Sequence, residues 1–208
     1  MSLRNEKTLT RTITFKTQGN HKSVVYKLCD EDHLVLSRAV EFEGEQRDGI
    51  AWTLLQRFAY IYPQYESLAT LIRTYSQPIN PSWFPNGVKH LNWLNLLIRE
   101  GKLNEAAIED KQAMKRLTYS KTSLTEISKP TRDTIDFVFS SISPIPGSVH
   151  YRAPTVSTDS IDIAHTARND FARKHYLAKP IDYGSITKDN WFFAASSSIN
   201  FNIKAIWS

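Results

Sequence analysis

The chain has a single cysteine, Cys29, among its 208 residues. One cysteine cannot form an internal disulfide, and it excludes zinc sites that need several cysteines. The seven glycines are scattered, so the glycine-rich loops that hold phosphates or dinucleotides are missing. No apolar run approaches the roughly 20 residues that cross a bilayer. These absences argue against a disulfide-stabilised, nucleotide-binding or membrane-spanning protein.

Metal-binding patterns are also missing. None of the six histidines has the H-E-x-x-H spacing of a zinc protease, and the aspartates do not follow calcium-loop spacing. There is no G-x-S-x-G serine nucleophile motif. We therefore expect no metal ion and no cofactor. The sequence begins without the apolar segment of a secretory signal, so action outside the cytoplasm is expected to need another route of delivery.

The formal net charge is +5, with an isoelectric point near 9.2. Residues 1–30 carry six Lys or Arg against Glu6 and Asp30, which gives this segment a net charge of +4. Such an excess suits nucleic acid, anionic cell-wall polymers or anionic lipid. No recognition motif accompanies the basic residues, so nucleic acid is the least favoured partner.

Helical periodicity dominates the middle of the chain. Residues 8–28 alternate loosely around a Q-G-N turn and predict a β-hairpin or an extended arm. Apolar residues then recur at helical spacing, with Asp48 and Thr131 as expected N-caps and Ser67 at the start of a helix. Alternation over 198–207 predicts a strand. The expected helices are 33–43, 48–61, 67–75, 89–100, 104–118, 131–139 and 159–176.

These elements predict a mainly α fold with β or extended material at both ends. A chain of 208 residues is long enough to bury one substantial core. We expect three parts: a basic arm or β-hairpin over 1–32, a helical domain over 33–155, and an irregular C-terminal extension over 156–208 that contains a helix and a possible strand.

Three glutamates occur within five positions in the stretch L-S-R-A-V-E-F-E-G-E-Q-R-D-G, residues 36–49. Glu43 continues the apolar stripe of its helix, whereas Glu41 points roughly opposite and Glu45 lies beyond the glycine that ends the helix. Partial burial and the helix C-terminus both raise the pKa of Glu43. A protonated carboxylic acid can donate to a glycosidic oxygen. The same pattern also fits a surface glutamate whose stem packs and whose head reaches water.

The stretch L-S-R-A-V-E-F-E-G-E-Q-R-D-G-I-A-W-T-L-L-Q-R-F resembles the signature of the cell-wall hydrolase family that includes the spore-cortex-lytic enzymes. That signature is a helix of the form L-A-R-x-x-x-x-E, followed by A-R-G-E and by x-x-x-G-x-x-A-V-x-x-V-x-x-N-R. Arg38 matches the helix arginine, and Glu43 matches the family's catalytic glutamate. The remaining matches are Gly44-Glu45 to G-E, Gly49 and Ala51 to G-x-x-A-V, and Gln56-Arg57 to N-R.

Two differences from the signature leave the choice of acid open. The A-R pair between glutamate and glycine is missing, and Gln56 stands where the family has asparagine. Glu45 and Glu41 therefore remain alternatives to Glu43. The resemblance spans roughly 34–155, with an insertion or divergent segment near 89–145.

The resemblance implies a lysozyme-like helical domain and cleavage of the β-1,4 bond between N-acetylmuramic acid and N-acetylglucosamine in peptidoglycan. In a lytic transglycosylase one acid is enough: Glu43 would protonate the leaving oxygen and then accept a proton from the muramyl 6-hydroxyl, which closes a 1,6-anhydro ring. A muramidase needs a second carboxylate, for which Asp48 and Glu45 are nearest in sequence. We expect the one-acid mechanism, with hydrolysis as the open alternative.

The resemblance also implies a set of substrate-binding residues. Y-S-Q-P at 75–78 lies where the family has a glutamine-containing segment, and P-G-S-V-H-Y at 146–151 is similar to its late G-A-T-H-Y-H. Aromatic rings can stack on sugar faces and amides can hold N-acetyl groups, although Trp83 also fits a core position and His150 a structural role. The expected substrate-binding residues are Glu45, Tyr75, Gln77, Asn80, Trp83, His150 and Tyr151.

Two classes of function follow. The first is a peptidoglycan-cleaving glycosidase, encoded by a phage and acting as a virion-associated or lysis enzyme in the virion or the host cell envelope. Residues 1–32 and 156–208 would then contact other virion proteins. The second is a structural or assembly protein of a phage virion that has a lysozyme-like domain without activity.

Overall fold

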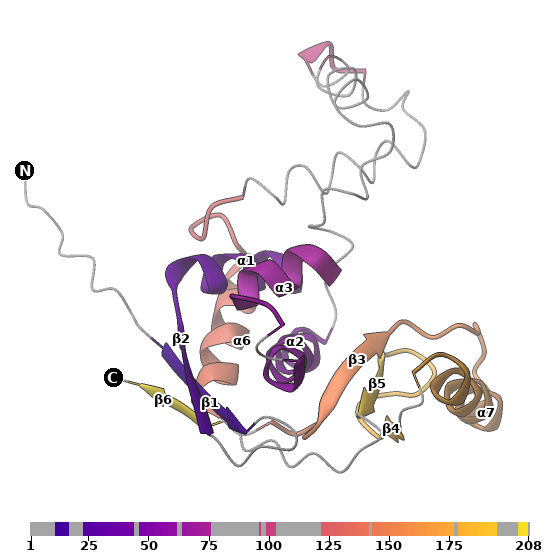
Figure 1. Ribbon diagram of the computed structural model, residues 1–208. Coiled ribbons are helices and arrows are strands. Elements are labelled where there is room, and N and C mark those ends of the chain that lie inside the picture. Colours follow the sequence, from indigo (N-terminus) through magenta and orange to yellow (C-terminus); the bar gives the residue numbers. More distant parts are fainter. Residues whose placement is uncertain are drawn as a thin grey trace, which may run out of the picture.

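The computed structural model describes residues 11–16, 23–43, 46–61, 64–75, 96, 99–102, 122–141, 143–176, 179–194 and 204–207. About half of these residues are helical. The helices are α1 (Asp30–Glu43), α2 (Arg47–Ile61), α3 (Leu68–Tyr75), α6 (Lys129–Ser140) and α7 (Ile161–Phe171), which the π-helical η3 (Ala172–Tyr176) continues. The strands form two three-stranded antiparallel sheets (Figure 1).

The first sheet has the strand order β2-β1-β6 and consists of β1 (Arg11–Lys16), β2 (Ser23–Leu28) and β6 (Lys204–Trp207). The β1–β2 pairing confirms the hairpin predicted within 8–28, and β6 confirms a strand within 198–207. Thr14 pairs with Val25 on one side and with Lys204 on the other. A two-stranded hairpin alone is marginal in water, so β6 supplies the third strand.

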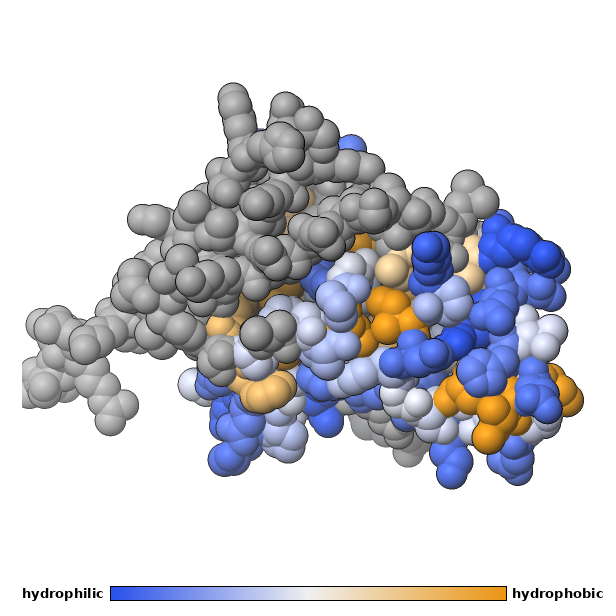
Figure 2. Space-filling view, turned by 90° about the horizontal axis from the view of Figure 1, so that it is seen from below, coloured by the Kyte–Doolittle hydropathy of each residue, from blue (hydrophilic) through white to orange (hydrophobic). Residues whose placement is uncertain are grey.

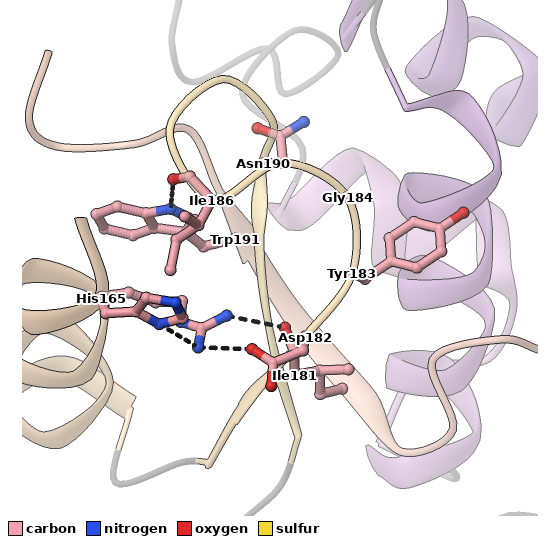
Figure 3. A pocket seen from close by; sticks show the side chains of 9 residues that line it. His165, Ile181, Asp182, Tyr183, Gly184, Ile186, Asn190 and Trp191 are labelled. Carbon is pink, nitrogen blue, oxygen red and sulfur yellow. Dashed lines mark hydrogen bonds and ion pairs between the residues drawn. The ribbon is translucent and has the colours of Figure 1, made fainter. Parts of the chain in front are cut away.

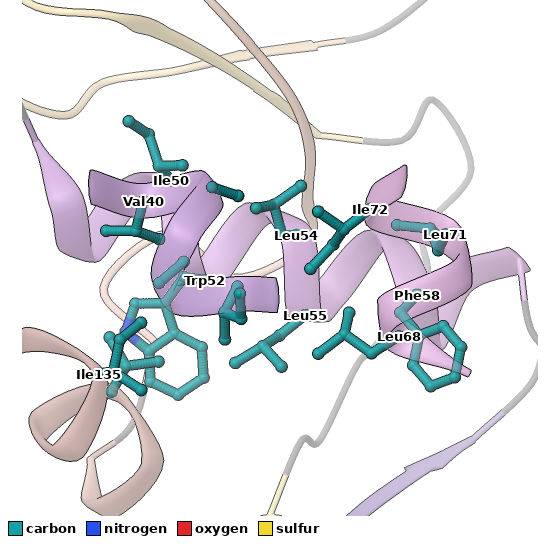
Figure 4. Close-up of a cluster of buried hydrophobic side chains, with 14 of the residues drawn as sticks. Val40, Ile50, Trp52, Leu54, Leu55, Phe58, Leu68, Leu71, Ile72 and Ile135 are labelled. Carbon is teal, nitrogen blue, oxygen red and sulfur yellow. The ribbon is translucent and has the colours of Figure 1, made fainter. Parts of the chain in front are cut away.

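The helical core is built around α2. Every residue from Ile50 to Gln56 is buried, as are Phe58 and Ala59, because α1, α3, α6 and the second sheet surround this helix. Figure 4 shows its apolar side chains between those of the neighbouring helices. The α6 contribution matters, because this helix lies within the segment that the resemblance treats as an insertion. The core residues from α6 are Ile135, Val138 and Phe139.

Polar caps fix the start of α3. The Ser67 hydroxyl accepts a hydrogen bond from the Thr70 N–H at 3.0 Å, as its predicted place at the helix start requires. The fully buried Asp32 of α1 accepts from the Ala69 N–H at 2.8 Å and from the Cys29 N–H at 3.1 Å. One buried carboxylate therefore accepts hydrogen bonds from backbone N–H groups at the starts of both α1 and α3.

Two of the predicted N-caps are wrong. Helix α2 begins at Arg47, one residue before Asp48, which lies in the first turn where the helix dipole favours a carboxylate. Helix α6 begins at Lys129, with Ser128 at the N-cap position, so Thr131 lies inside the helix. A proline in the first turn explains the early start, because its fixed φ suits that position.

The second sheet lies between α2 and α7, as Figure 1 shows. Its strand order is β3-β5-β4, formed by β3 (Ser148–Arg152), β5 (Trp191–Ala194) and β4 (Lys179–Ile181). Phe192 belongs to the helical core, whereas Trp191 and Phe193 pack with α7 and η3 residues in a separate cluster. The sheet therefore crosses the boundary expected at residue 155 and joins the C-terminal segment to the helical core.

Helix α7 presents apolar side chains outward as well as inward. Ser160 caps the helix by accepting from the Ile163 N–H at 3.5 Å. Ile161 and Ile163 are 60% and 55% exposed, and Figure 2 shows apolar surface bordered by hydrophilic residues at the side of the molecule where α7 lies. Within the described ranges, no helix combines the length and apolarity that a membrane crossing requires.

Candidate active site at the α1–α2 junction

Glu43, the expected acid, is the last residue of α1 and is partly buried. The Tyr151 hydroxyl of β3 donates a hydrogen bond to Glu43 Oε1 at 3.0 Å. Burial raises the pKa of Glu43, and the hydrogen bond from Tyr151 partly opposes this rise. The C-terminal end of α1 also disfavours a negative charge. Burial is thus the main cause that raises the pKa of Glu43, the direction expected from the sequence.

Phe192 lies between two tyrosines that each reach a carboxylate. Its ring centroid is 6.5 Å from that of Tyr151 and 5.5 Å from that of Tyr183, which meets it edge-on at 78°. The Tyr183 hydroxyl donates to Asp48 Oδ2, and burial together with Asp48 raises the pKa of Tyr183. The three rings thus connect the second sheet to Glu43 at the end of α1 and to Asp48 at the start of α2.

Close packing at Phe192 requires a glycine in α2. A Cβ atom added at Gly49 would lie 2.5 Å from Phe192 Cζ, well inside van der Waals contact. Gly49 is the position that the resemblance aligns with a glycine of the family signature. Its role in this structure is to let the helix approach the sheet.

The junction between α1 and α2 is also tied to the loop that joins β4 and β5. Gln46 adopts a left-handed backbone conformation with φ of 51°, and its side-chain oxygen accepts the Asn190 N–H at 2.5 Å. Gly184, with φ of 71°, lies so close that an added Cβ would be 2.5 Å from Gln46 Nε2. This contact holds residues 182–190 against the start of α2.

Glu41 has a structural role. Its Oε2 accepts hydrogen bonds from the hydroxyls of Ser128, at 2.6 Å, and Thr131. Burial alone would raise the pKa of Glu41, but these hydrogen bonds and the nearby Arg47 lower it overall. Arg47 Nε also donates to Thr131 Oγ1 at 3.0 Å. Glu41 therefore anchors α6 to the α1–α2 junction as a carboxylate, which makes it a poor proton donor.

Gln56 holds the loop that precedes β3. Its Oε1 accepts the Gly147 N–H at 2.6 Å, and its Nε2 donates to the carbonyl oxygens of Ile145, at 3.1 Å, and Trp52, at 3.2 Å. Beside it, the buried hydroxyls of Thr53 and Ser148 lie 2.7 Å apart. These bonds fix the start of the strand that presents Tyr151 to Glu43.

His150, expected to bind or orient substrate, is partly buried on β3 beside Tyr151. Burial and the nearby positive charge of Arg57 lower the pKa of His150 to about 4. The imidazole is therefore neutral around neutral pH. It can exchange hydrogen bonds but does not contribute a positive charge.

The structure brings Glu43 and Tyr151 into contact, although 108 positions separate them, and His150 precedes Tyr151 on β3. Tyr75 is the last residue of α3. Glu45, Gln77, Asn80 and Trp83 lie outside the described residues. No sequence pattern indicated the roles of Gln46, Tyr183 or Phe192, and the aromatic run W-F-F is the one local signal that could have indicated this sheet.

A pocket of about 420 Å³ opens on the α7 side of the second sheet, and neither Glu43 nor Tyr151 lines it. Its wall includes Tyr183, which also contacts Asp48. The other lining residues are His165, Arg168, Ile181, Asp182, Gly184, Ile186, Asn190 and Trp191. Across the described part of the chain, no group of three or more His, Cys, Asp or Glu side chains is placed to hold a metal ion.

The chemistry of the junction is thus a carboxyl group with a raised pKa beside a phenol. Such a group can donate a proton and, after losing it, accept one. Compared with known proteins, this chain matches no protein-family model, no curated protein and no solved structure.

Proposed function

We propose that the protein cleaves the glycan strands of peptidoglycan, with Glu43 as the proton donor. The contact between Glu43 and Tyr151 carries this proposal. Glu43 and Tyr151 belong to two segments that are far apart in the sequence, and each segment is similar to a motif of the cell-wall hydrolase family. Their meeting at 3.0 Å supports that alignment, and the raised pKa of Glu43 supports its role as an acid.

The proposed reaction begins with Glu43 protonated. Oε1 accepts the hydrogen bond from Tyr151, so Oε2 would carry the proton that passes to the glycosidic oxygen. Glu43 then becomes a carboxylate, and the same hydrogen bond stabilises the new charge. In the one-acid route this carboxylate takes a proton from the muramyl 6-hydroxyl. The hydrogen bond from Tyr151 therefore favours the carboxylate that forms after proton donation, and it makes the donation itself less favourable.

The one-acid route is favoured because Asp48 already has a partner. Tyr183 donates to Asp48 Oδ2, which holds this carboxylate against the aromatic cluster. A muramidase would need it about 5 Å or about 6.5–9.5 Å from the acid, with a free path to the sugar. Mass spectrometry of the digest separates the routes, because transglycosylation leaves 1,6-anhydro ends and hydrolysis leaves reducing ends.

We propose that the helical part is a mainly α, lysozyme-like domain and that the protein is a phage virion-associated or lysis enzyme. In that setting the first and last segments of the chain, 1–32 and 156–208, would contact other virion proteins. The basic composition suits the anionic polymers of a cell wall.

A zymogram with purified sacculi tests the enzymatic proposal. The wild-type protein is expected to clear the gel, and Glu43→Gln to reduce clearing by about 100-fold or more, because general acid catalysis contributes that much. Glu66→Gln is the matched control, since Glu66 is exposed and remote in sequence from the junction. Equal clearing by the wild type and Glu43→Gln would remove Glu43 from the mechanism.

A second candidate is a structural or assembly protein. It is favoured by the fact that both tyrosine–carboxylate contacts also join the second sheet to the helices. Under this proposal neither the wild type nor Glu43→Gln clears the gel, while Tyr151→Phe and Tyr183→Phe both lower the free energy of unfolding.

A further inference from the structure

The pocket on the α7 side contains a buried arginine. Arg168 of α7 is 6% exposed and lines the pocket together with His165, Asp182, Ile186 and Trp191. Figure 3 shows the His165 and Asp182 side chains on one side of this space and the Ile186 and Trp191 side chains on the other. The pocket therefore combines a charged wall with an apolar wall.

The charge of Arg168 is compensated in an asymmetric way. Its Nη2 lies 2.7 Å from Asp182 Oδ1, yet the Asp182 side chain is 85% exposed whereas that of Arg168 is 8% exposed. Nη1 donates to the Ile181 carbonyl oxygen at 3.3 Å, and Nη2 lies 3.2 Å from His165 Nδ1. Arg168 Nε is buried and has no hydrogen-bond partner within the part of the chain that the structure describes. Among the described residues, Asp182 is the one carboxylate in ion-pair contact with this guanidinium.

A buried guanidinium needs an anion, because it cannot lose its proton and its charge is costly away from water. An exposed carboxylate meets that need weakly, since water competes for it. A ligand carboxylate entering the pocket could replace Asp182 on Arg168 while Asp182 turned into water. The guanidinium would keep an ion pair, and its fork of donors suits a carboxylate well.

The opposite wall suits an apolar group. The Trp191 indole N–H donates to the Ile186 carbonyl oxygen at 2.8 Å, so its polar atom is already satisfied. Trp191 and Ile186 belong to the apolar cluster that packs against α7. The volume of about 420 Å³ lies in the range of small-molecule sites.

We propose that this pocket binds a small ligand with a carboxylate and an apolar body. The carboxylate takes the place of Asp182 on Arg168, and the body lies against Ile186 and Trp191. The proposal does not depend on peptidoglycan cleavage, because it uses neither Glu43 nor Tyr151.

Isothermal titration calorimetry of the full chain tests the proposal with a matched pair of probes, N-acetyl-L-leucine and N-acetyl-L-leucinamide. The two differ in one charge. The acid is expected to bind about tenfold or more tightly than the amide, since only the acid can pair with Arg168. Binding of both with equal affinity, or of neither at millimolar concentration, overturns the proposal.

Two charge variants test the exchange itself. Asp182→Asn removes the competing carboxylate and is expected to tighten binding of N-acetyl-L-leucine about three- to tenfold. Asp162→Asn removes an exposed charge from the same helix region without touching this pocket, and is expected to leave the affinity unchanged. Unchanged or weaker binding in Asp182→Asn, or equal tightening in both variants, overturns the exchange.

Arg168→Gln is expected to abolish binding of the acid. Because Arg168 is buried, circular dichroism must first show that this variant folds. If Arg168→Gln does not fold, Asp182→Asn still tests the proposal, because the Asp182 side chain is largely exposed and its substitution leaves the core unchanged.

Discussion

Glu41 and Glu43 lie two residues apart at the end of α1, yet their carboxyl groups have opposite environments. Glu41 accepts hydrogen bonds from the hydroxyls of Ser128 and Thr131, and its pKa is lowered. Glu43 is partly buried beside Tyr151, and its pKa is raised. One turn of helix therefore holds a carboxylate that anchors structure and a carboxylic acid that can release a proton.

The raised pKa of Glu43 makes the stability of the wild type depend on pH. Folding favours the protonated form, so this contribution is fully present below the ordinary glutamate pKa and is lost as pH rises through the folded value. Glu43→Gln cannot ionise. The difference in free energy of unfolding, variant minus wild type, is therefore expected to increase as pH rises above the ordinary glutamate pKa of about 4.3, as measured by urea denaturation. A difference that stays constant with pH would contradict the raised pKa.

Glu41→Gln is expected to show the opposite trend. The lowered pKa means that Glu41 stabilises the fold above the ordinary glutamate pKa and loses this effect as pH falls through the folded value. The variant should be less stable than the wild type at neutral pH, and the difference should shrink in acid. The same urea series measures it, with Glu66→Gln as the control on an exposed glutamate.

Tyr151→Phe is expected to raise the pKa of Glu43 further, because the lost hydrogen bond favoured the carboxylate. If Glu43 is the acid, activity falls as pH rises through its pKa. The alkaline limb of the pH–rate profile should then move up by about one pH unit, as expected for a hydrogen bond worth about 1.4 kcal/mol. Tyr183→Phe removes a similar bond from Asp48 and should leave the limb in place.

Gly49→Ala is expected to lower the free energy of unfolding by about 1–3 kcal/mol, the usual cost of overpacking. The added methyl group would meet the Phe192 ring at 2.5 Å. Combining it with Phe192→Leu should cost less than the sum of the two single changes, because the smaller side chain makes room. Additive effects in this double-mutant cycle would contradict the contact.

Gln56→Leu is expected to lower the free energy of unfolding by about 1–3 kcal/mol, because it leaves the Gly147 N–H without its partner and removes one of the two hydrogen bonds that the Ile145 carbonyl oxygen accepts. Urea denaturation measures the loss. Hydrogen exchange at Gly147 should rise more than at Phe58, a buried site on the same helix. Equal changes at both sites would indicate a general loss of stability without a role for Gln56 in the loop.

The helices were predictable where two local signals coincided. Apolar spacing and a terminal signal together placed α1, α2 and α3 within a few residues of their observed bounds, and α7 lies within the predicted helix 159–176. The prediction of Thr131 as an N-cap was wrong because its hydroxyl donates a hydrogen bond to Glu41 of α1. Such a contact joins distant segments and leaves no local trace in the sequence.

The second sheet was not predicted because its strands have no alternating pattern. Trp191, Phe192 and Phe193 are all buried, since α2 covers one face of the sheet and α7 the other. A strand buried on both faces appears as a short apolar run, which periodicity cannot distinguish from other buried segments. Tyr151 was identified by resemblance alone, and its partner Glu43 by its place on an apolar stripe.

The position of β1 in the first sheet has a consequence for biosynthesis. β1 is the middle strand, and its register pairs Thr14 with Lys204. While the ribosome makes the intervening residues, one edge of β1 stays open to other chains, and such edges promote aggregation. Nascent molecules crowded on one messenger RNA would be the most exposed to this hazard, and a chaperone that shields the hairpin would relieve it.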